Sequence, residues 1–246
     1  ELAVLREAEL QGLYVEDIEL IRLSGLPFSY ELGSFSATRR RLDSASVERD
    51  FRLMAQRMRR AVAQTAVTAR VNWSFQVTRG SVASELLAAA DAAEMLTLGR
   101  VGRTPGRQLG STARRIMQQA RHPVFLLGDE GLTLPLTLLL TGSPASDRAL
   151  ALATTIMLGH TEPLQLIVIT DPAYDAAERE LRAKRCVDQL SSQALTADLY
   201  LLDRAEELLE LQGAMAPGTL ILPGDLVMML ETLHQSLILV PEQSNR

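Results

Sequence analysis

The sequence predicts an α/β fold in which helices cover both faces of parallel sheets. Short apolar runs alternate with amphipathic helical patterns along most of the 246 residues. The runs are continuously apolar, as in strands that are buried on both faces. The order of elements also starts again after Gly131. We therefore expect two tandem, doubly wound parallel-sheet units, residues 1–131 and residues 132–246.

Composition narrows the functional classes. With 47% apolar residues the chain can bury a sizeable core, and its net charge of −5 argues against nucleic acid or a membrane surface as partner. The basic clusters Arg39–Arg41 and Arg57–Arg60 have acidic neighbours and are expected to form solvated faces. The single cysteine, Cys186, excludes an intrachain disulfide and favours a cytoplasmic location. No membrane span is expected, because the apolar run Leu132–Leu140 is short and contains Pro135.

The first half begins with a helical pattern, a strand and a long connection. Glu1–Leu10 has the pattern of the end of an amphipathic helix, and Gln11–Val15 leads into a strand. Glu16–Leu42 is longer than a usual connection, and segments of this length form lids, partner loops or flexible regions. Apolar residues at spacings of three and four predict a helix over Ser44–Ala66, whose methionines are expected in the core.

Strands and helices then alternate to the end of the chain. Alternating apolar and polar residues predict a strand over Val71–Val77, and Pro144 stands where a helix should start. The other expected strands are Glu94–Leu98, Pro123–Leu127, Leu134–Thr141, Leu164–Thr170, Asp198–Leu202, Thr219–Leu222 and Leu237–Val240. The other expected helices are Ser81–Ala93, Ser111–Ala120, Ala145–Gly159, Tyr174–Leu195, Ala205–Gln212 and Asp225–His234.

One segment, residues 98–112, has the pattern of a phosphate-binding loop, and we call it the cradle. It follows an apolar run that ends at Leu98, and ligands of open α/β sheets bind at the carboxyl ends of strands. Ser111 and Thr112 then open a helix whose free backbone N–H groups attract anions. Glycine lets the backbone approach a ligand closely, and arginine can donate two hydrogen bonds to one phosphate. The cradle contains Gly99, Gly102, Gly106, Gly110, Arg100, Arg103 and Arg107.

A purely structural turn is an alternative interpretation of the cradle. Turns between a strand and a helix use glycine for their own geometry. Exposed arginines are often only solvated. Both interpretations stay open on the sequence.

Several segments are similar to one protein family, across nearly the whole chain and in two copies. They are Gly12–Asp17, Gly80 before the helix at Ser81, Ala93–Gly99, and the run from Gly110 to Leu127. On these segments the chain resembles the universal stress protein family. The resemblance implies a Rossmann-like, adenine nucleotide alpha hydrolase-like fold and a role in the stress response. It also implies ATP or another adenine nucleotide as the cofactor of the binding members.

The resemblance assigns site residues in the first half only. Carried over by position, Val15 and Leu98 would flank the base. Ribose and phosphates would be held by Gly99, Gly102, Gly110, Ser111 and Thr112, with Arg103 and Arg107 as further donors to the anion. The middle of the cradle, Arg103–Leu109, is two residues shorter than the family's pattern, so a smaller anion is the alternative to a triphosphate. No catalytic residue and no metal ligand is assigned.

Each half departs from the family pattern in its own way. The family's first strand ends in Asp followed by Gly-Ser, whereas the first half opens inside the helix that comes next. Loss of a central strand would expose two sheet edges, so we expect upstream residues of the native protein to supply it. In the second half, Thr141-Gly142-Ser143 stands where the family has Asp-Gly-Ser after its first strand. In a later loop of this half, Pro223-Gly224-Asp225, the acid Asp225 stands where phosphate would approach. We expect a degenerate second site that is retained for packing.

Three functional classes are considered. The first is a cytoplasmic stress-response protein that binds an adenine nucleotide or another anion in the first half. The second is a ligand-free interaction module that uses Glu16–Leu42. An enzyme is the weakest class, because the cradle has no neighbouring base, and weak ATP hydrolysis is the most that we expect.

The expected partners are a small anionic ligand and the second half of the same chain. In the family the last strands of two units pair, so Val124–Leu127 and Leu237–Val240 are the expected contact strands of an intramolecular pseudo-dimer. A homodimer is a further option. Neither nucleic acid nor a membrane is an expected partner.

Overall fold

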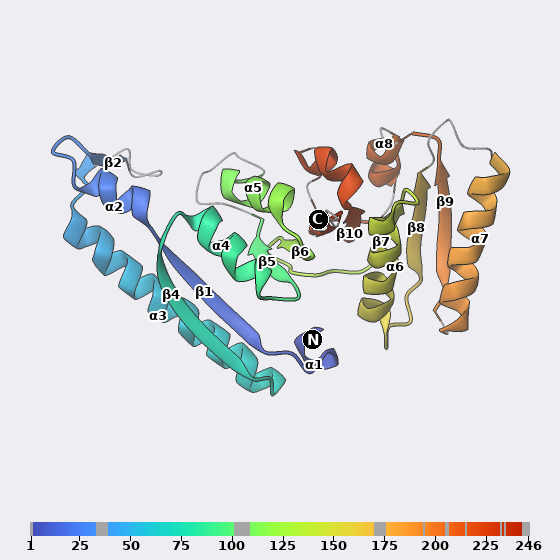
Figure 1. The fold of residues 1–246 in the computed structure, drawn as a ribbon, viewed down its shortest axis with the longest axis horizontal. Helices are drawn as coiled ribbons and strands as arrows, with labels where there is room; N and C mark the ends of the chain where they lie inside the picture. The colour runs from blue at the N-terminus through green and yellow to red at the C-terminus, as the bar shows by residue number, and fades with distance from the viewer. Residues whose placement is uncertain are drawn as a thin grey trace. The chain divides into compact units, whose positions relative to one another are not determined.

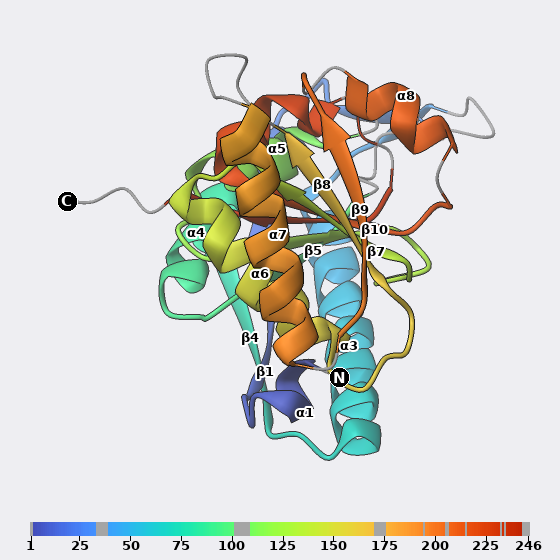
Figure 2. The same cartoon turned by 90° about the vertical axis from the view of Figure 1, so that its right-hand side faces the viewer.

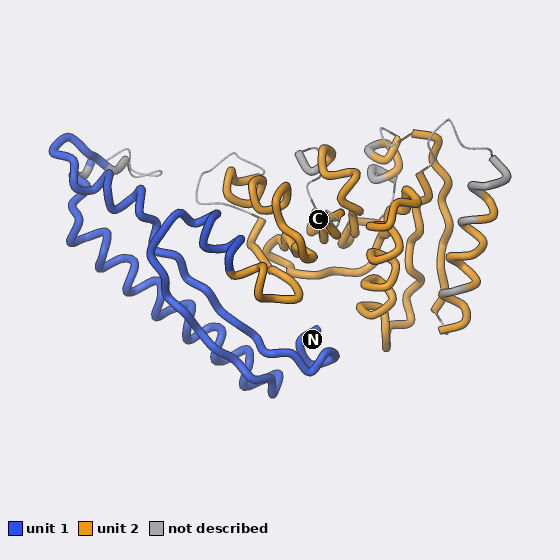
Figure 3. The backbone as a smooth tube through the Cα atoms, in the orientation of Figure 1, with its two compact units in different colours: residues 1–88 blue, residues 89–246 orange. Residues whose placement is uncertain are grey.

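Parallel strands and helices alternate along the chain, which confirms the predicted α/β class. The structure, a computed structural model, describes residues 2–32, 39–100, 109–169, 176–193, 195–204, 207–214, 216–231, 233 and 235–242. The chain divides into unit 1, residues 1–88, and unit 2, residues 89–246 (Figures 1 and 3). The boundary between the two units lies after Ala88, whereas the sequence predicts a repeat boundary at Gly131. The repeat boundary remains a prediction. Below, residues 1–131 and 132–246 are called the first and second half.

Unit 1 is built on two parallel strands and one long helix. β1 (Leu10–Asp17) pairs with β4 (Trp73–Gly80), and α3 (Ser44–Ala69) contacts both strands. Asp43 caps α3 by accepting a hydrogen bond from the Ser46 backbone N–H, at 2.9 Å. The helix ends at Arg70, which adopts the left-handed conformation with φ 56°.

The other elements of unit 1 are short. α1 (Leu2–Leu5) is shorter than the helix predicted over Glu1–Leu10. The long connection contains α2 (Ile18–Ser24) and an antiparallel pair of strands, β2 (Tyr30–Leu32) and β3 (Arg39–Arg41). α4 (Val82–Asp91) begins in unit 1 and ends in unit 2.

The core of unit 1 follows one face of α3. Val47, Phe51, Ala55 and Ala66 are buried, and the Phe51 ring meets Tyr14 of β1 edge-on, with 6.3 Å between ring centroids. The prediction that the methionines of this helix lie in the core is wrong for Met58, which is 46% exposed. A sheet of two strands is too narrow to cover the full apolar stripe of a 26-residue helix.

Unit 2 contains a sheet of seven strands. Their order is β5-β6-β11-β10-β7-β8-β9, and all neighbours are parallel except β6 and β11, which are antiparallel. The strands are β5 (Leu96–Gly99), β6 (Val124–Leu127), β7 (Leu136–Leu140), β8 (Leu164–Ile169), β9 (Ala197–Leu202), β10 (Thr219–Pro223) and β11 (Leu237–Val240). The pairing of β6 with β11 confirms the predicted contact strands and joins the two halves in one sheet.

Helices accompany this sheet. They are α5 (Ser111–Gln119), α6 (Pro144–Met157), α7 (Ala176–Ser192) and α8 (Glu207–Ala214). α6 contacts β7, β10 and β11, α7 contacts β9, and both helices run alongside the strands (Figures 1 and 2). Gly224–Glu231 forms a 3₁₀ helix, η1, where the sequence predicts an ordinary helix. Every residue of β7, β10 and β11 is buried, so the core of unit 2 lies at these strands.

Candidate functional site

The structure places the predicted site residues in both units. Leu98, Gly99, Gly110, Ser111 and Thr112 belong to unit 2, and Val15 belongs to unit 1. Gly102, Arg103 and Arg107 lie outside the described residues. The part of the cradle that can be described is therefore its two ends.

The first end of the cradle is the carboxyl end of β5, at the edge of the seven-stranded sheet. Leu98 is half-buried and lies in register with Leu126 of β6. Gly99, the last residue of the strand, is exposed, and a Cβ atom at this position would meet no described atom within 4 Å. Space is therefore available where an α/β sheet presents its ligand site.

The second end of the cradle is the start of α5, which has no side-chain cap. Its N-cap residue, Gly110, has an extended backbone with φ −66° and ψ 150°, and no acidic residue lies in the first turn. In the part of the chain that the structure describes, no side chain accepts a hydrogen bond from the N–H groups of Ser111, Thr112 or Ala113. Such N–H groups carry the positive end of the helix dipole and attract anions.

Packing holds this helix start in place. Ala113, Ile116 and Met117 are buried, so one apolar face of α5 is packed away from solvent. Ser111 on the other side is exposed. A ligand at the start of α5 would meet an anchored helix, and little ordering of the helix would be needed on binding.

Arg100 is not a donor to an anion, so the prediction for this arginine is wrong. Its side chain is only 6% exposed, and its guanidinium donates to the Gln235 carbonyl at 2.7 Å and to the Leu233 carbonyl. Burial lowers the pKa of the Arg100 guanidinium, which nevertheless stays charged, as arginine does in proteins. Arg100 thus ties the end of β5 to the segment before β11. The sequence gives no signal for this contact, because the partners are 133 and 135 residues away.

In the second half, the start of α6, which follows β7, is closed by side chains. Ser143 caps α6 by accepting a hydrogen bond from the Ser146 backbone N–H. The Ser143 hydroxyl also donates to Asp225 Oδ1 at 3.1 Å, from the first turn of η1. Asp225 therefore puts a carboxylate beside the start of α6, where it would repel an anion.

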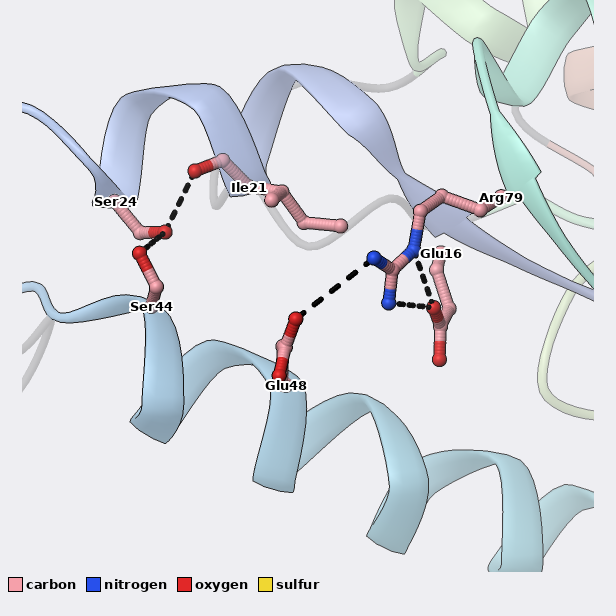
Figure 4. Close-up of polar contacts among 6 residues, drawn as sticks. All are labelled: Glu16, Ile21, Ser24, Ser44, Glu48 and Arg79. Atoms are coloured by element: carbon pink, nitrogen blue, oxygen red, sulfur yellow. Dashed lines mark hydrogen bonds and ion pairs between the residues drawn. The ribbon is translucent and has the colours of Figure 1, made fainter.

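Val15 lies near the carboxyl end of β1, next to a cluster of charged residues that the sequence analysis missed. Arg79 of β4 donates to Glu16 of β1, with N···O distances of 2.7 and 2.9 Å, and lies 3.7 Å from Glu48 of α3 (Figure 4). These contacts link β4 to β1 and α3. Only the pairing of β1 with β4 brings Glu16 and Arg79 together, since they are 63 residues apart.

A second polar contact lies close to this cluster in Figure 4. The Ser24 hydroxyl donates to the Ile21 carbonyl at 2.7 Å and lies 3.1 Å from the Ser44 hydroxyl. It joins the end of α2 to the start of α3. Ser24 is buried, so this contact is part of the packing of unit 1.

The described ranges contain neither a candidate metal site nor a candidate membrane span. Within them, no three His, Cys, Asp or Glu side chains are grouped so that they could hold a metal ion. No helix there is both long enough and apolar enough to cross a membrane.

Comparison with known proteins gives matches at the level of structure. No protein-family model matches the sequence, and no curated protein matches it. A universal stress protein from Archaeoglobus fulgidus superimposes with a TM-score of 0.68 at 13% identity, over 100% of this chain and 92% of that one. A protein from Pseudomonas aeruginosa with the same family name gives a TM-score of 0.58 at 12% identity, over 97% and 95% of the two chains.

A third structure extends this result. A functionally unknown protein from Pseudomonas aeruginosa matches with a TM-score of 0.60 at 11% identity, over 98% of this chain and 85% of that one. All three matches cover both halves of the chain, so the likeness is not confined to one of them. The chain has the fold of the universal stress proteins.

Proposed function

We propose that the protein is a cytoplasmic stress-response protein whose first half binds an adenine nucleotide or a smaller anion at the cradle. The fold supports a role in the stress response, and the single cysteine supports a cytoplasmic location. The two halves are tandem repeats in this proposal, and the first half carries the site.

One observation carries the ligand proposal: among the described residues, the start of α5 has no side-chain cap. Gly110 supplies no side-chain acceptor, and a Cβ atom at Gly110 would meet no described atom within 4 Å. The start of α6 is a contrasting helix start in the same chain, because it is capped by Ser143, which also binds Asp225. α5 follows β5 and α6 follows β7, and both strands belong to the same sheet. A side chain accepts a hydrogen bond from the first turn of α6, whereas no N-cap side chain does so at α5.

The chemistry of the cradle favours a phosphate group. The N–H groups of Ser111, Thr112 and Ala113 would donate to its oxygens, and Arg103 and Arg107 would add charged donors. Leu98 would flank the base of a nucleotide, as the family resemblance implies. Binding without efficient hydrolysis is proposed, since the first turn of α5 contains no acid that could orient water.

Titration calorimetry of the full chain tests this proposal. ATP, ADP, AMP and pyrophosphate are added at fixed ionic strength, and binding with one site per chain is expected for at least one of them. The double variant R103A/R107A should lower the affinity by roughly tenfold or more, because two charged hydrogen bonds to the anion are lost. The matched control is R59A/R60A, which removes the same charge from the exposed side of α3 and should leave the affinity unchanged.

Two results would overturn the ligand proposal. One is the absence of both heat and thermal shift with all four compounds. The other is an equal loss of affinity in R103A/R107A and R59A/R60A, which would show that only net charge matters. Phosphate release from ATP, measured in parallel, should stay near the uncatalysed level.

An interaction module is the second candidate, and exposed apolar side chains in the long connection favour it. Phe28 is 72% exposed, and Leu23, Leu26 and Tyr30 are also exposed. Arg39 lies over the Tyr30 ring at 3.7 Å and adds a cation to this patch. Such patches mark contact sites for other proteins. This candidate predicts no heat in any of the four titrations, so the same experiment separates the two.

A further inference from the structure

The seven-stranded sheet has β9 as one of its two outer strands. Among the described strands, β9 has only β8 beside it (Figure 1). β9 belongs to the second half, whose five strands are neighbours in the order β11-β10-β7-β8-β9. The strand that we expect upstream belongs to the first half, so the edge at β9 does not follow from its absence.

The outer edge of β9 presents backbone groups that can pair with a further strand. The Leu164 N–H of β8 donates to the Thr196 carbonyl, and backbone groups alternate in direction along a strand. The N–H and carbonyl groups of Leu199 and Leu201 therefore point away from β8. β9 has the sequence ADLYLL and thus contains no lysine or proline, the residues that commonly protect an edge from pairing.

The side chains of the same two leucines are exposed on one face of the strand. Leu199 is 42% exposed and Leu201 is 48% exposed, and residues two apart in a strand share a face. Their partners on β8, Leu166 and Val168, are buried. The apolar surface of the sheet therefore continues to its outer edge, where it meets solvent.

This edge is complementary to a second copy of itself. In an antiparallel pair centred on Tyr200, Leu199 of each copy lies opposite Leu201 of the other. Because the backbone groups of both leucines point outward, each such pair would exchange two hydrogen bonds, and the four exposed side chains would share one face. The chain already contains an antiparallel contact between strands of its two halves, with Phe125 of β6 opposite Ile238 of β11.

Asp198, the one charged residue of β9, selects this register. In the pair centred on Tyr200, the two copies of Asp198 lie four residues apart, which is about 13 Å along the strands. That separation exceeds the Debye length of about 8 Å at physiological ionic strength, so the repulsion is screened. A pair centred on Leu199 would place the two carboxylates only two residues apart, about 7 Å along the strands, within the Debye length.

We infer that the outer edge of β9 is a self-association site, at which a second copy of the chain adds its own β9 antiparallel and centred on Tyr200. Main-chain hydrogen bonds and the cluster of four leucines supply the affinity. The contact is closed, because both copies use the same edge. Two six-residue strands form a small contact compared with a standard interface of about 1,600 Å², so the dimer should dissociate on dilution.

Sedimentation equilibrium of the full chain tests this inference. A monomer–dimer equilibrium is expected between about 1 μM and about 500 μM. Leu201→Lys should raise the dissociation constant at least about tenfold, because the ammonium group would be packed beside Leu199 of the other copy. The matched control is Leu158→Lys at the end of α6, where the leucine is 51% exposed, and it should leave the constant unchanged. Both variants should keep the unfolding midpoint of the parent chain, since they replace exposed side chains.

Disulfide trapping tests the register in a Cys186→Ser background. Residues opposite each other in a non-hydrogen-bonded antiparallel pair have Cα atoms about 4.5 Å apart, which a disulfide can bridge. Tyr200→Cys should therefore give a covalent dimer under mild oxidation. Thr196→Cys is the control, because its two copies would lie eight residues apart, about 26 Å along the strands, and it should stay monomeric.

Three results would overturn the inference. The first is a monomer at every concentration. The second is an equal effect of Leu201→Lys and Leu158→Lys on the dissociation constant, which would place the contact elsewhere or make it nonspecific. The third is equal trapping of Tyr200→Cys and Thr196→Cys, because random collision would then explain both covalent dimers.

Discussion

At the residue scale, Gly99 and Arg100 are neighbours with opposite environments. Gly99 is exposed and a Cβ atom there would meet no described atom within 4 Å, whereas Arg100 is buried and donates to two carbonyls. We assign a ligand contact to Gly99 and a structural role to Arg100. These assignments predict that the two residues affect different measurements.

The variant Arg100→Met should lower the free energy of unfolding by about 1–3 kcal/mol, because the Leu233 and Gln235 carbonyls lose their buried donor. Urea denaturation followed by circular dichroism measures this change. Arg121→Met is the control, since the Arg121 side chain is 76% exposed, and it should cost less than about 0.5 kcal/mol. Similar losses for both variants would refute the structural role of Arg100.

The variant Gly99→Ala should bind pyrophosphate more weakly while its free energy of unfolding changes by less than about 0.5 kcal/mol. The added methyl group enters the space that the ligand would use and meets no described atom. In Gly218→Ala, by contrast, the added Cβ would collide with the Pro135 backbone. This variant should lower the free energy of unfolding by about 1–3 kcal/mol. Unchanged affinity in Gly99→Ala would mean that this glycine serves only the turn.

At the element scale, α5 and α6 differ in their N-cap residue, and the cap bears on whether an anion can reach the first N–H groups. Ser143 occupies the cap of α6, whereas Gly110 leaves the cap of α5 empty. Capping an N–H group with a hydroxyl stabilises a helix and takes the same donors that an anion needs. Stability and binding should therefore change in opposite directions when a cap is added.

The variant Gly110→Ser should raise the free energy of unfolding by a few tenths of a kcal/mol, because serine supplies the missing cap. The extended backbone at Gly110 suits serine, and a Cβ atom there would meet no described atom within 4 Å. Affinity for pyrophosphate should fall in the same protein, as calorimetry can show. Ser143→Gly is the reciprocal control, with a slightly lower stability and unchanged affinity. A rise in stability without loss of affinity would place the anion elsewhere.

Most elements were predictable from the sequence, because local patterns define them. The prediction for α3, Ser44–Ala66, starts at the observed residue, since Asp43 caps the helix and apolar residues recur on one face. The exposure of Met58 was not predictable, because it depends on how many strands cover that face. For the same reason Arg100 could not be assigned, as its partners are distant in the sequence. The ends of the cradle were predictable because glycine and serine mark a strand end and a helix start.

At the scale of the whole molecule, the described strands of the first half fall in three sheets. β5 and β6 join the second half in the seven-stranded sheet, β1 and β4 form a second sheet, and β2 and β3 form a third. Pairing of β6 with β11 followed from the family resemblance. In the second half, β7 lies between β10 and β8, whereas the described first half has no strand that corresponds to β7. Two-stranded sheets are marginally stable without further packing.

Unit 1 should therefore open more readily than unit 2. The amides of β1 that bond to β4 should exchange at least about tenfold faster than the equivalent amides of β8 that bond to β9. Residue-resolved hydrogen exchange measures both sets in one sample. Equal protection of β1 and β8 would contradict the view that the described two-stranded sheet opens more readily than the seven-stranded one.

Backbone amide shifts during a titration with ATP or pyrophosphate test most directly whether the start of α5 is an anion site. We predict saturating shifts, with one site per chain, at Ser111, Thr112 and Ala113. The amides of Ala145 and Ser146 at the start of α6 should not move. Absence of saturating shifts in α5 with both compounds, or shifts confined to α6, would contradict the proposed site.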